Sequence, residues 1–181
     1  MSPEDAWTVL NEADLIADEI SVHSAIVRLA AELTARFKDR HPLLLVVMNG
    51  GVFFAGQLLP MLRFPLELDY VHATRYGAAT SGGELVWKAR PEHSLKDRCV
   101  LVIDDVLDEG KTLAAINDHV MGEGAAACHL VVLTEKDTGK PKPVRAEYVG
   151  LSLPNRFVFG CGLDISGAWR NLPEIYAKRG H

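Results

Sequence analysis

Seven consecutive or nearly consecutive residues in the stretch VLVIDDVLDEGKT, at 100–112, have side chains or backbone suited to chemistry. They are Asp104, Asp105, Asp108, Glu109, Gly110, Lys111 and Thr112. Two adjacent carboxylates can accept hydrogen bonds from two neighbouring hydroxyl groups, such as those of a ribose. A third carboxylate, at Asp108, can exchange a proton or stabilise positive charge at a reacting carbon.

The GKT segment favours a phosphate site of a particular kind. Successive backbone N–H groups at 108–112, at the start of a helix, can hold a phosphate monoester, and Thr112 can add a hydroxyl donor. A triphosphate-binding P-loop needs glycine five positions before Gly110, where this chain has Asp105. A receiver domain also has paired acids after a strand, but they lie near the N-terminus of the domain. Asp104 and Asp105 lie past the midpoint of this chain, which disfavours a receiver domain. A merely solvated turn is disfavoured because the run is compact, Gly110 frees the backbone and a helix follows directly.

Alternating strand and helix patterns surround this stretch. We expect strands at 43–48, 66–74, 99–105 and 128–136, one or two short strands within 146–164, and a hairpin strand ending in ELVWKA at 84–89. Helices are expected at 12–38, broken or split near Ser21, and at 52–62 and 111–121. This order predicts an α/β fold whose mostly parallel sheet is covered on both faces. Ligands then bind beyond the carboxyl ends of the strands, where both Asn49-Gly50-Gly51 and the acidic stretch lie.

Composition and charge limit the classes of partner and the cellular compartment expected for this chain. The chain has 181 residues, enough for one domain with a substantial core, and a formal net charge of −5, which argues against general nucleic-acid binding. Three cysteines without a CxxC pair disfavour a zinc site or a redox dithiol and favour a reducing, cytoplasmic compartment. The acidic N-terminal stretch lacks the pattern of a signal peptide, and the longest apolar run, LLLVVM, is too short to cross a membrane.

Four blocks in order resemble a known family: VVMNGG, TRYG, VLVIDDVLDEGKT, and LTEK followed by RFVFGCGLD. They resemble the type I phosphoribosyltransferases, which use phosphoribosyl diphosphate (PRPP), and within them the 6-oxopurine, hypoxanthine-guanine branch. The blocks span about 43–170. The resemblance implies a three-layer phosphoribosyltransferase-type fold, with a mostly parallel twisted central sheet, helices on both faces and a small hood. It implies one domain over 1–181, with a core at about 40–150, a hood from the N-terminal segment and about 151–181, and a mobile loop at about 75–90.

The resemblance also assigns roles for PRPP. The ribose hydroxyls would contact Asp104 and Asp105, and the 5′-phosphate would lie in the 108–112 segment. The pyrophosphate would meet the backbone of Asn49 and Gly50, often with a cis peptide after Met48, and the guanidinium of Arg170. Arg75 and Tyr76 would begin the loop that closes over the reaction.

Further roles concern the purine and the metal. Asp108 would lie near the purine N7 and move its proton. Lys136 would donate to O6, although a lysine after a strand is usually solvated. Phe157 would stack on the ring, Val158 would read its polar edge through the backbone, and Asp164 would orient a water bound to Mg²⁺. The implied partners are PRPP, a 6-oxopurine base and other copies of the chain, as a homodimer or homotetramer, with no nucleic acid and no membrane.

Three positions depart from the pattern common in eukaryotic relatives. Asn49 stands where lysine is frequent, Glu109 where threonine is frequent, and Arg75 where serine is frequent. An acid facing a phosphate would repel it, so we predict that Glu109 points outward and offers only its N–H. Arg75 is a candidate for the positive charge absent at Asn49.

Two alternatives to a hypoxanthine-guanine enzyme stay open at this point. One is a xanthine-preferring or broad-specificity purine transferase, because the contacts to the purine C2 substituent are not legible. The other is a non-catalytic regulator of the same fold that binds PRPP or nucleotide and controls gene expression. The acidic charge balance and the joint presence of Asp108, Lys136 and Phe157 favour an enzyme.

Overall fold

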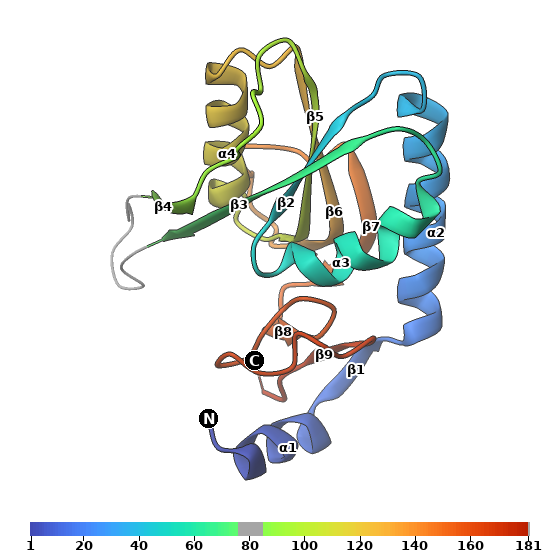
Figure 1. The fold of residues 1–181 in the computed structure, drawn as a ribbon. Helices are drawn as coiled ribbons and strands as arrows, with labels where there is room; N and C mark the ends of the chain where they lie inside the picture. The colour runs from blue at the N-terminus through green and yellow to red at the C-terminus, as the bar shows by residue number, and fades with distance from the viewer. Residues whose placement is uncertain (76–84, 181) are drawn as a thin grey trace.

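The protein is described from a computed structural model, which covers residues 1–75 and 85–180. Its centre is a six-stranded sheet of order β4-β3-β2-β5-β6-β7 (Figure 1). The strands are β2 (Leu43–Val47), β3 (Glu67–Arg75), β4 (Leu85–Ala89), β5 (Cys99–Leu107), β6 (Ala127–Asp137) and β7 (Tyr148–Pro154). The pairs β3–β2, β2–β5, β5–β6 and β6–β7 are parallel, and β4 runs antiparallel to β3 at the edge of the sheet.

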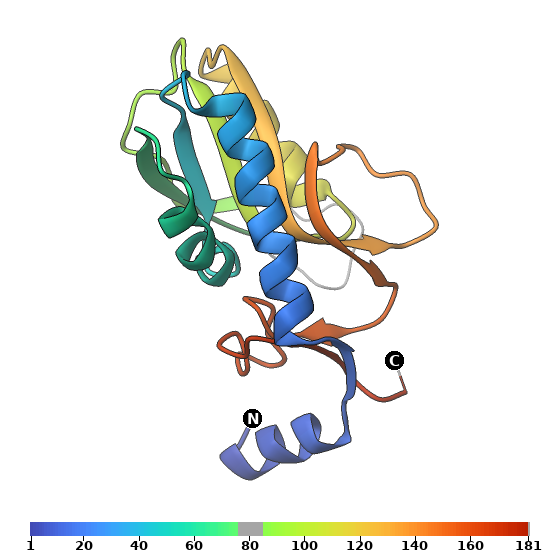
Figure 2. The same cartoon turned by 90° about the vertical axis from the view of Figure 1, so that its right-hand side faces the viewer.

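Helices cover both faces of this sheet, as the strand–helix alternation predicts (Figure 2). α2 (Glu19–Phe37) and α3 (Gly51–Leu58), extended by the 3₁₀ turn η1 (Leu59–Met61), pack on one face. α4 (Lys111–Gly122) packs on the other face. Successive residues of β2 and β5 point to opposite faces, so their continuous apolar runs supply both cores. The three-layer fold is therefore confirmed.

A second, smaller sheet forms the hood below the carboxyl ends of the central strands (Figure 1). Its three antiparallel strands have the order β1-β9-β8, with β1 (Asp14–Ala17), β8 (Val158–Phe159) and β9 (Ile175–Ala177). The hood therefore joins segments from both ends of the chain over one edge of the site.

The expectation of helix over 12–38, broken or split near Ser21, is wrong at its beginning. Leu15 and Ile16 belong to strand β1, and α2 begins at Glu19, where the Asp18 carboxylate accepts the Ser21 N–H at 2.8 Å. The spacing of these apolar residues fits either structure, and pairing with β9 decides for the strand. A preceding helix, α1 (Pro3–Glu12), was not expected, although a capping box between Ser2 and Asp5 marks its start.

β5 is longer than the apolar run indicates. The strand was expected to end at Asp105, but its pairing with β6 continues to Leu107. Both Asp104 and Asp105 are therefore strand residues held in the sheet, and the other two acids, Asp108 and Glu109, lie beyond its end.

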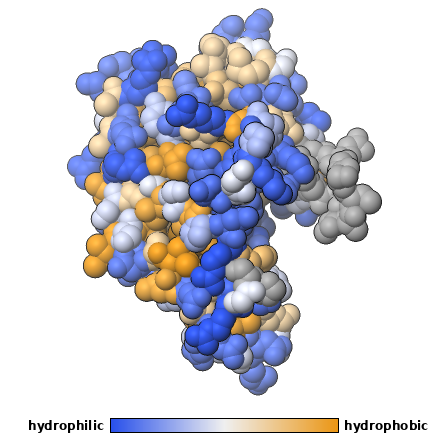
Figure 3. Space-filling view, turned by 180° about the vertical axis from the view of Figure 1, so that it is seen from behind, coloured by the Kyte–Doolittle hydropathy of each residue, from blue (hydrophilic) through white to orange (hydrophobic). Residues whose placement is uncertain are grey.

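In the described part of the chain, no helix is both long enough and apolar enough to cross a membrane. Seen from behind, hydrophilic side chains cover much of the surface, and apolar side chains gather near the middle of that face (Figure 3).

Candidate active site

Two neighbouring carboxylates are buried where β5 approaches its carboxyl end. Asp104 is 7% exposed and Asp105 is 8% exposed, and the Asp105 N–H donates to Asp104 Oδ1 at 2.9 Å. Burial, and then repulsion from Asp105, raises the pKa of Asp104 well above its ordinary value. Burial likewise raises the pKa of Asp105, while the positive charge of Arg170 opposes the rise. Such a pair favours a ligand that brings hydroxyl donors or positive charge to it.

The turn after β2 lies directly against these acids. Its peptide bond between Met48 and Asn49 is cis, as the resemblance implies. A Cβ atom on Gly50 would lie 2.1 Å from Asp105 Oδ2, and one on Gly51 would lie 2.7 Å from the Ile103 carbonyl oxygen. The turn approaches β5 this closely only because both positions lack a side chain. Its backbone therefore shares one site with the paired acids.

The segment between β5 and α4 forms a cradle. Gly110 adopts the left-handed conformation, with φ of 77°, immediately before α4, and no side chain caps the first turn of that helix. The helix N-terminus thus offers backbone N–H groups and its positive dipole end to an anion. A cavity of ≈350 Å³ joins this cradle to the acids; its lining is Asp104, Asp105, Val106, Asp108, Glu109, Gly110, Lys111, Thr112 and Leu113.

Glu109 lies at the edge of that cavity, and its side chain extends largely into solvent. Its side chain is 71% exposed, and its carboxylate pairs with Lys111 Nζ at 2.8 Å. This agrees with the prediction that the acid points outward, and the pairing reduces the negative charge next to the cradle.

Asp108 and Lys136 are brought together from different strands. Asp108 follows β5, Lys136 lies near the end of β6, and Lys136 Nζ donates to Asp108 Oδ2 at 2.7 Å. The lysine side chain is 13% exposed and the aspartate side chain 43%. Sequence analysis named both residues as candidates but did not predict that they form an ion pair with each other. The pair places a carboxylate that can accept a proton beside a lysine ammonium at the carboxyl ends of β5 and β6.

Arg170 and Asp164 are paired close to the buried acids, and the charge of Arg170 opposes the rise in the pKa of Asp105. An Arg170 guanidinium nitrogen donates to Asp164 Oδ1, and another donates to the Gly162 carbonyl oxygen. The Gly167 N–H donates to Asp164 Oδ2 at 2.7 Å, so the acid is held from two sides. A Cβ atom on Gly162 would lie 2.1 Å from the Gly50 carbonyl oxygen, which places Gly162 against the turn after β2.

Phe157 and Val158 lie where the chain enters the hood. The Phe157 side chain is 48% exposed, whereas Val158 is buried in β8 and pairs with Ala177. An aromatic side chain this exposed is not core, so a planar ligand can stack on it. Tyr76 lies outside the described residues, and of Arg75 only the backbone, at the end of β3, is described.

Comparison with known proteins gives this arrangement a family. The Phosphoribosyl transferase domain family matches residues 15–166. A hypoxanthine-guanine phosphoribosyltransferase of Bacillus subtilis (strain 168) is 33% identical over 165 residues, covering 91% of each chain. The chain belongs to the phosphoribosyltransferase family, in its hypoxanthine-guanine branch.

Other members of the family show the same relation. A hypoxanthine-guanine-xanthine phosphoribosyltransferase of Tritrichomonas foetus is 33% identical, over 89% of this chain and 88% of that protein. A solved hypoxanthine phosphoribosyltransferase of Staphylococcus aureus superposes with a TM-score of 0.89 at 26% identity, over 95% of each chain. The bifunctional protein TilS/HprT of Listeria innocua is 36% identical over 162 residues, and the chain spans only 25% of its length.

Sequence analysis did not identify two residues that contact the site, Thr134 and Gly162. Thr134, in the LTEK block, is fully buried, and its hydroxyl donates to the Asp105 carbonyl oxygen at 2.8 Å. Gly162, in the FGCGLD block, has φ of 103° and touches the Gly50 backbone. A polar residue within an apolar strand, and a second glycine after a short strand, were the available signals.

Proposed function

We propose that this phosphoribosyltransferase transfers the 5-phosphoribosyl group of PRPP to N9 of hypoxanthine or guanine, giving IMP or GMP and pyrophosphate. The observation that carries the proposal is the position of the Asp108–Lys136 pair beside the cavity formed by the paired acids and the cradle. A sugar phosphate and a purine can then be held with their reacting atoms between the two halves of the site.

The geometry supports a proposal for how PRPP is held in one half of the site. The 5′-phosphate accepts backbone N–H groups of 109–112 at the start of α4. The ribose hydroxyls donate hydrogen bonds to Asp104 and Asp105. These bonds replace part of the hydration that the two carboxylates lose on burial. The pyrophosphate meets the backbone at Asn49 and Gly50 and the guanidinium of Arg170, whose planar donors suit paired phosphate oxygens.

The chemical step breaks the bond between C1′ and the pyrophosphate oxygen and forms a bond between C1′ and N9. Positive charge develops on the ribose as pyrophosphate leaves, and the carboxylates stabilise it electrostatically. The proton on N7 of the attacking tautomer passes to Asp108, while the Lys136 ammonium donates to O6. Phe157 stacks on the ring and fixes its plane, and the Val158 backbone contacts its polar edge.

Mg²⁺ bound to PRPP as part of the substrate would neutralise charge on the leaving pyrophosphate. In the described residues, no three His, Cys, Asp or Glu side chains gather to form a complete metal cage. Magnesium often keeps several waters and takes one or two carboxylates plus substrate phosphates, which fits this set. Asp164, held by Arg170 and the Gly167 N–H, would accept a hydrogen bond from one of those waters.

We place the reaction in the cytoplasm and in a homodimer or homotetramer. In support of a reducing compartment, all three cysteines are free, and burial raises the pKa of both Cys128 and Cys161 to about 12. In support of self-association, Val52, Leu68 and Tyr70 are exposed and help to line a largely apolar cavity of ≈450 Å³. A dimer or tetramer mass in solution is expected, and a monomer mass at micromolar concentration would contradict this part.

Substitution of Asp108 by asparagine tests the proposed chemistry. Because positioned acid–base groups contribute about 10²–10⁴-fold, Asp108→Asn should lose turnover on that scale. PRPP affinity, measured by calorimetry with Mg²⁺, should stay close to wild type. The matched control is Asp118→Asn, an exposed aspartate on α4. Near-wild-type turnover in Asp108→Asn would refute the assignment.

A further inference from the structure

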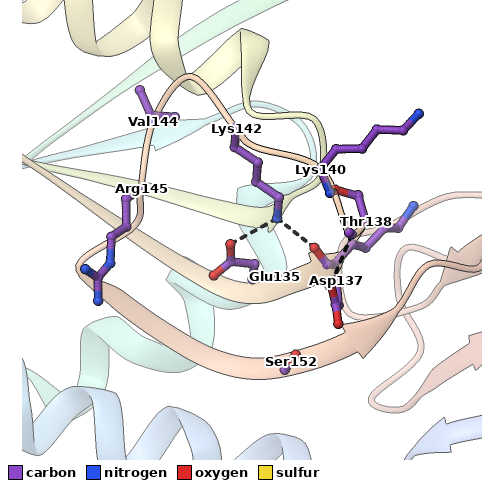
Figure 4. A pocket seen from close by; sticks show the side chains of 10 residues that line it. Glu135, Asp137, Thr138, Lys140, Lys142, Val144, Arg145 and Ser152 are labelled. Carbon is purple, nitrogen blue, oxygen red and sulfur yellow. Dashed lines mark hydrogen bonds and ion pairs between the residues drawn. The ribbon is translucent and has the colours of Figure 1, made fainter.

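A lysine in the loop after β6 reaches back to the two strand ends that carry the reaction. The loop at 138–144, here called the strap, contains Lys142, whose side chain is only 11% exposed. Lys142 Nζ donates to Glu135 Oε1 at 3.0 Å (Figure 4). It also donates to the Leu107 carbonyl oxygen at 3.1 Å and to the Lys136 carbonyl oxygen at 2.7 Å. An ammonium group has three donors, so these three acceptors satisfy all of them. A buried and fully paired ammonium is a built connection, not a solvated loop charge.

The three acceptors mark the end of the ladder between β5 and β6. The last paired residues of that ladder are Leu107 and Glu135. Lys142 contacts both members of this pair and then the next residue along β6, Lys136. Asp108, the first residue after β5, has no ladder partner on β6 to fix it. The lysine therefore continues the connection between the strands where the backbone pairing stops.

The strap also supports the phosphate cradle. Lys142 lies between Pro141 and Pro143, whose rings restrict the backbone and so limit the movement of the loop. A Cβ atom on Gly110 would lie 3.3 Å from Pro143 Cδ and 3.4 Å from Val144 Cγ2, so the strap packs directly on the left-handed turn. The strap and Asp108 line a common cavity of ≈740 Å³.

We propose that Lys142 is a positioning residue that holds Asp108 and Lys136 in register with each other and with the cradle. Lys142 acts on them through the backbone on either side of the ion pair. The inference rests on the proposed function, because it assumes that this ion pair handles the purine. It adds that the spacing of the pair is set by a residue outside the four sequence blocks that carry the family resemblance.

Three variants test the proposal in the full-length protein. Lys142→Met removes the charge and the donors, Lys142→Arg keeps a charged donor group, and Lys140→Met removes an exposed lysine of the same strap. Because a misplacement of about 1 Å can cost ~10²-fold in rate, Lys142→Met should lower kcat by roughly 10- to 100-fold. Lys142→Arg should recover much of that loss, and Lys140→Met should match wild type. All assays should be run well below the melting temperature of each variant.

Amide hydrogen exchange provides a readout that does not need activity. In Lys142→Met, amides at 106–112 and 135–138 should exchange faster than in wild type, with little change elsewhere. Equal kcat and equal exchange in Lys142→Met and Lys140→Met would overturn the proposal. So would a loss of kcat that Lys142→Arg does not reduce. If wild type itself forms no nucleotide, the proposed function fails, and the exchange comparison still decides whether Lys142 holds the two strand ends.

Discussion

Gly50 should tolerate no side chain, and alanine at this position tests how closely the turn after β2 fits against the paired acids Asp104 and Asp105. In the structure, an alanine Cβ would lie 2.1 Å from Asp105 Oδ2, 2.5 Å from its Cγ and 2.8 Å from its Oδ1. Ordinary van der Waals contact begins near 3.4 Å, so the carboxylate or the turn must move by about 1.3 Å. Asp105 has little room to move, because it is a strand residue of β5 and is only 8% exposed.

This displacement sets the expected magnitude. A shift of about 1 Å in a positioning group can cost ~10²-fold, so Gly50→Ala should lower kcat/KM for PRPP by about that factor. Overpacking should also lower the free energy of unfolding by about 1–3 kcal/mol. The assay is initial-rate nucleotide formation with PRPP varied at saturating base, alongside thermal unfolding.

Gly56→Ala is the matched control. Gly56 lies in α3, six residues after Gly50, and a Cβ atom added to it would meet nothing within 4 Å. Alanine is favoured over glycine in a helix interior by about 0.5–1 kcal/mol, so this variant should be as active as wild type and slightly more stable. Wild-type kcat/KM in Gly50→Ala would refute the claim that the turn and Asp105 form one fitted site.

Three further variants test separate parts of the account. Asp104→Asn should raise the melting temperature, because burial raises the pKa of Asp104 in the folded protein. The contribution of Asp104 to stability is complete below its pKa in the unfolded chain, 3.8, and is lost as the pH rises through its higher pKa in the folded protein. The gain should be on the order of 1 kcal/mol, or about 2–4 °C, at pH 8 and smaller at pH 5, with PRPP binding lost; an equal or lower melting temperature at pH 8 would contradict this. Phe157→Ala should raise the KM for the base by roughly 5- to 150-fold, since stacking on a base is worth about 1–3 kcal/mol, with stability little changed because the ring is exposed; an unchanged KM would remove the stacking role. Arg75→Ala should raise the KM for PRPP by about 10- to 100-fold if Arg75 supplies the charge absent at Asn49, and unchanged KM and kcat for PRPP would remove that idea.

Sequence patterns were sufficient wherever the chain is locally consistent. The apolar runs that become β2, β5 and β6, and the glycine turns after them, predicted the central sheet and the edge at which the site lies. The acidic stretch predicted the cradle, because Gly110 and the start of α4 are neighbours in the chain. These features depend on short-range spacing, which a sequence shows directly.

Contacts between distant segments could not be read in the same way. Leu15 and Ile16 fit a helix or a strand, and only pairing with β9, from the other end of the chain, decides between them. The ion pair of Asp108 with Lys136 spans 28 positions, and the support of that pair by Lys142 comes from a loop to which the sequence analysis assigned no role. Such contacts depend on the register between strands, which no local pattern states.

The central claim is tested most directly by measuring PRPP-dependent nucleotide formation with hypoxanthine, guanine, xanthine and adenine side by side, in the presence of Mg²⁺. The account predicts that hypoxanthine or guanine yields IMP or GMP with one pyrophosphate per nucleotide, and that adenine, which lacks O6, yields little. Absence of product with all four bases, with PRPP still bound, would contradict the transferase and favour a non-catalytic regulator of the same fold.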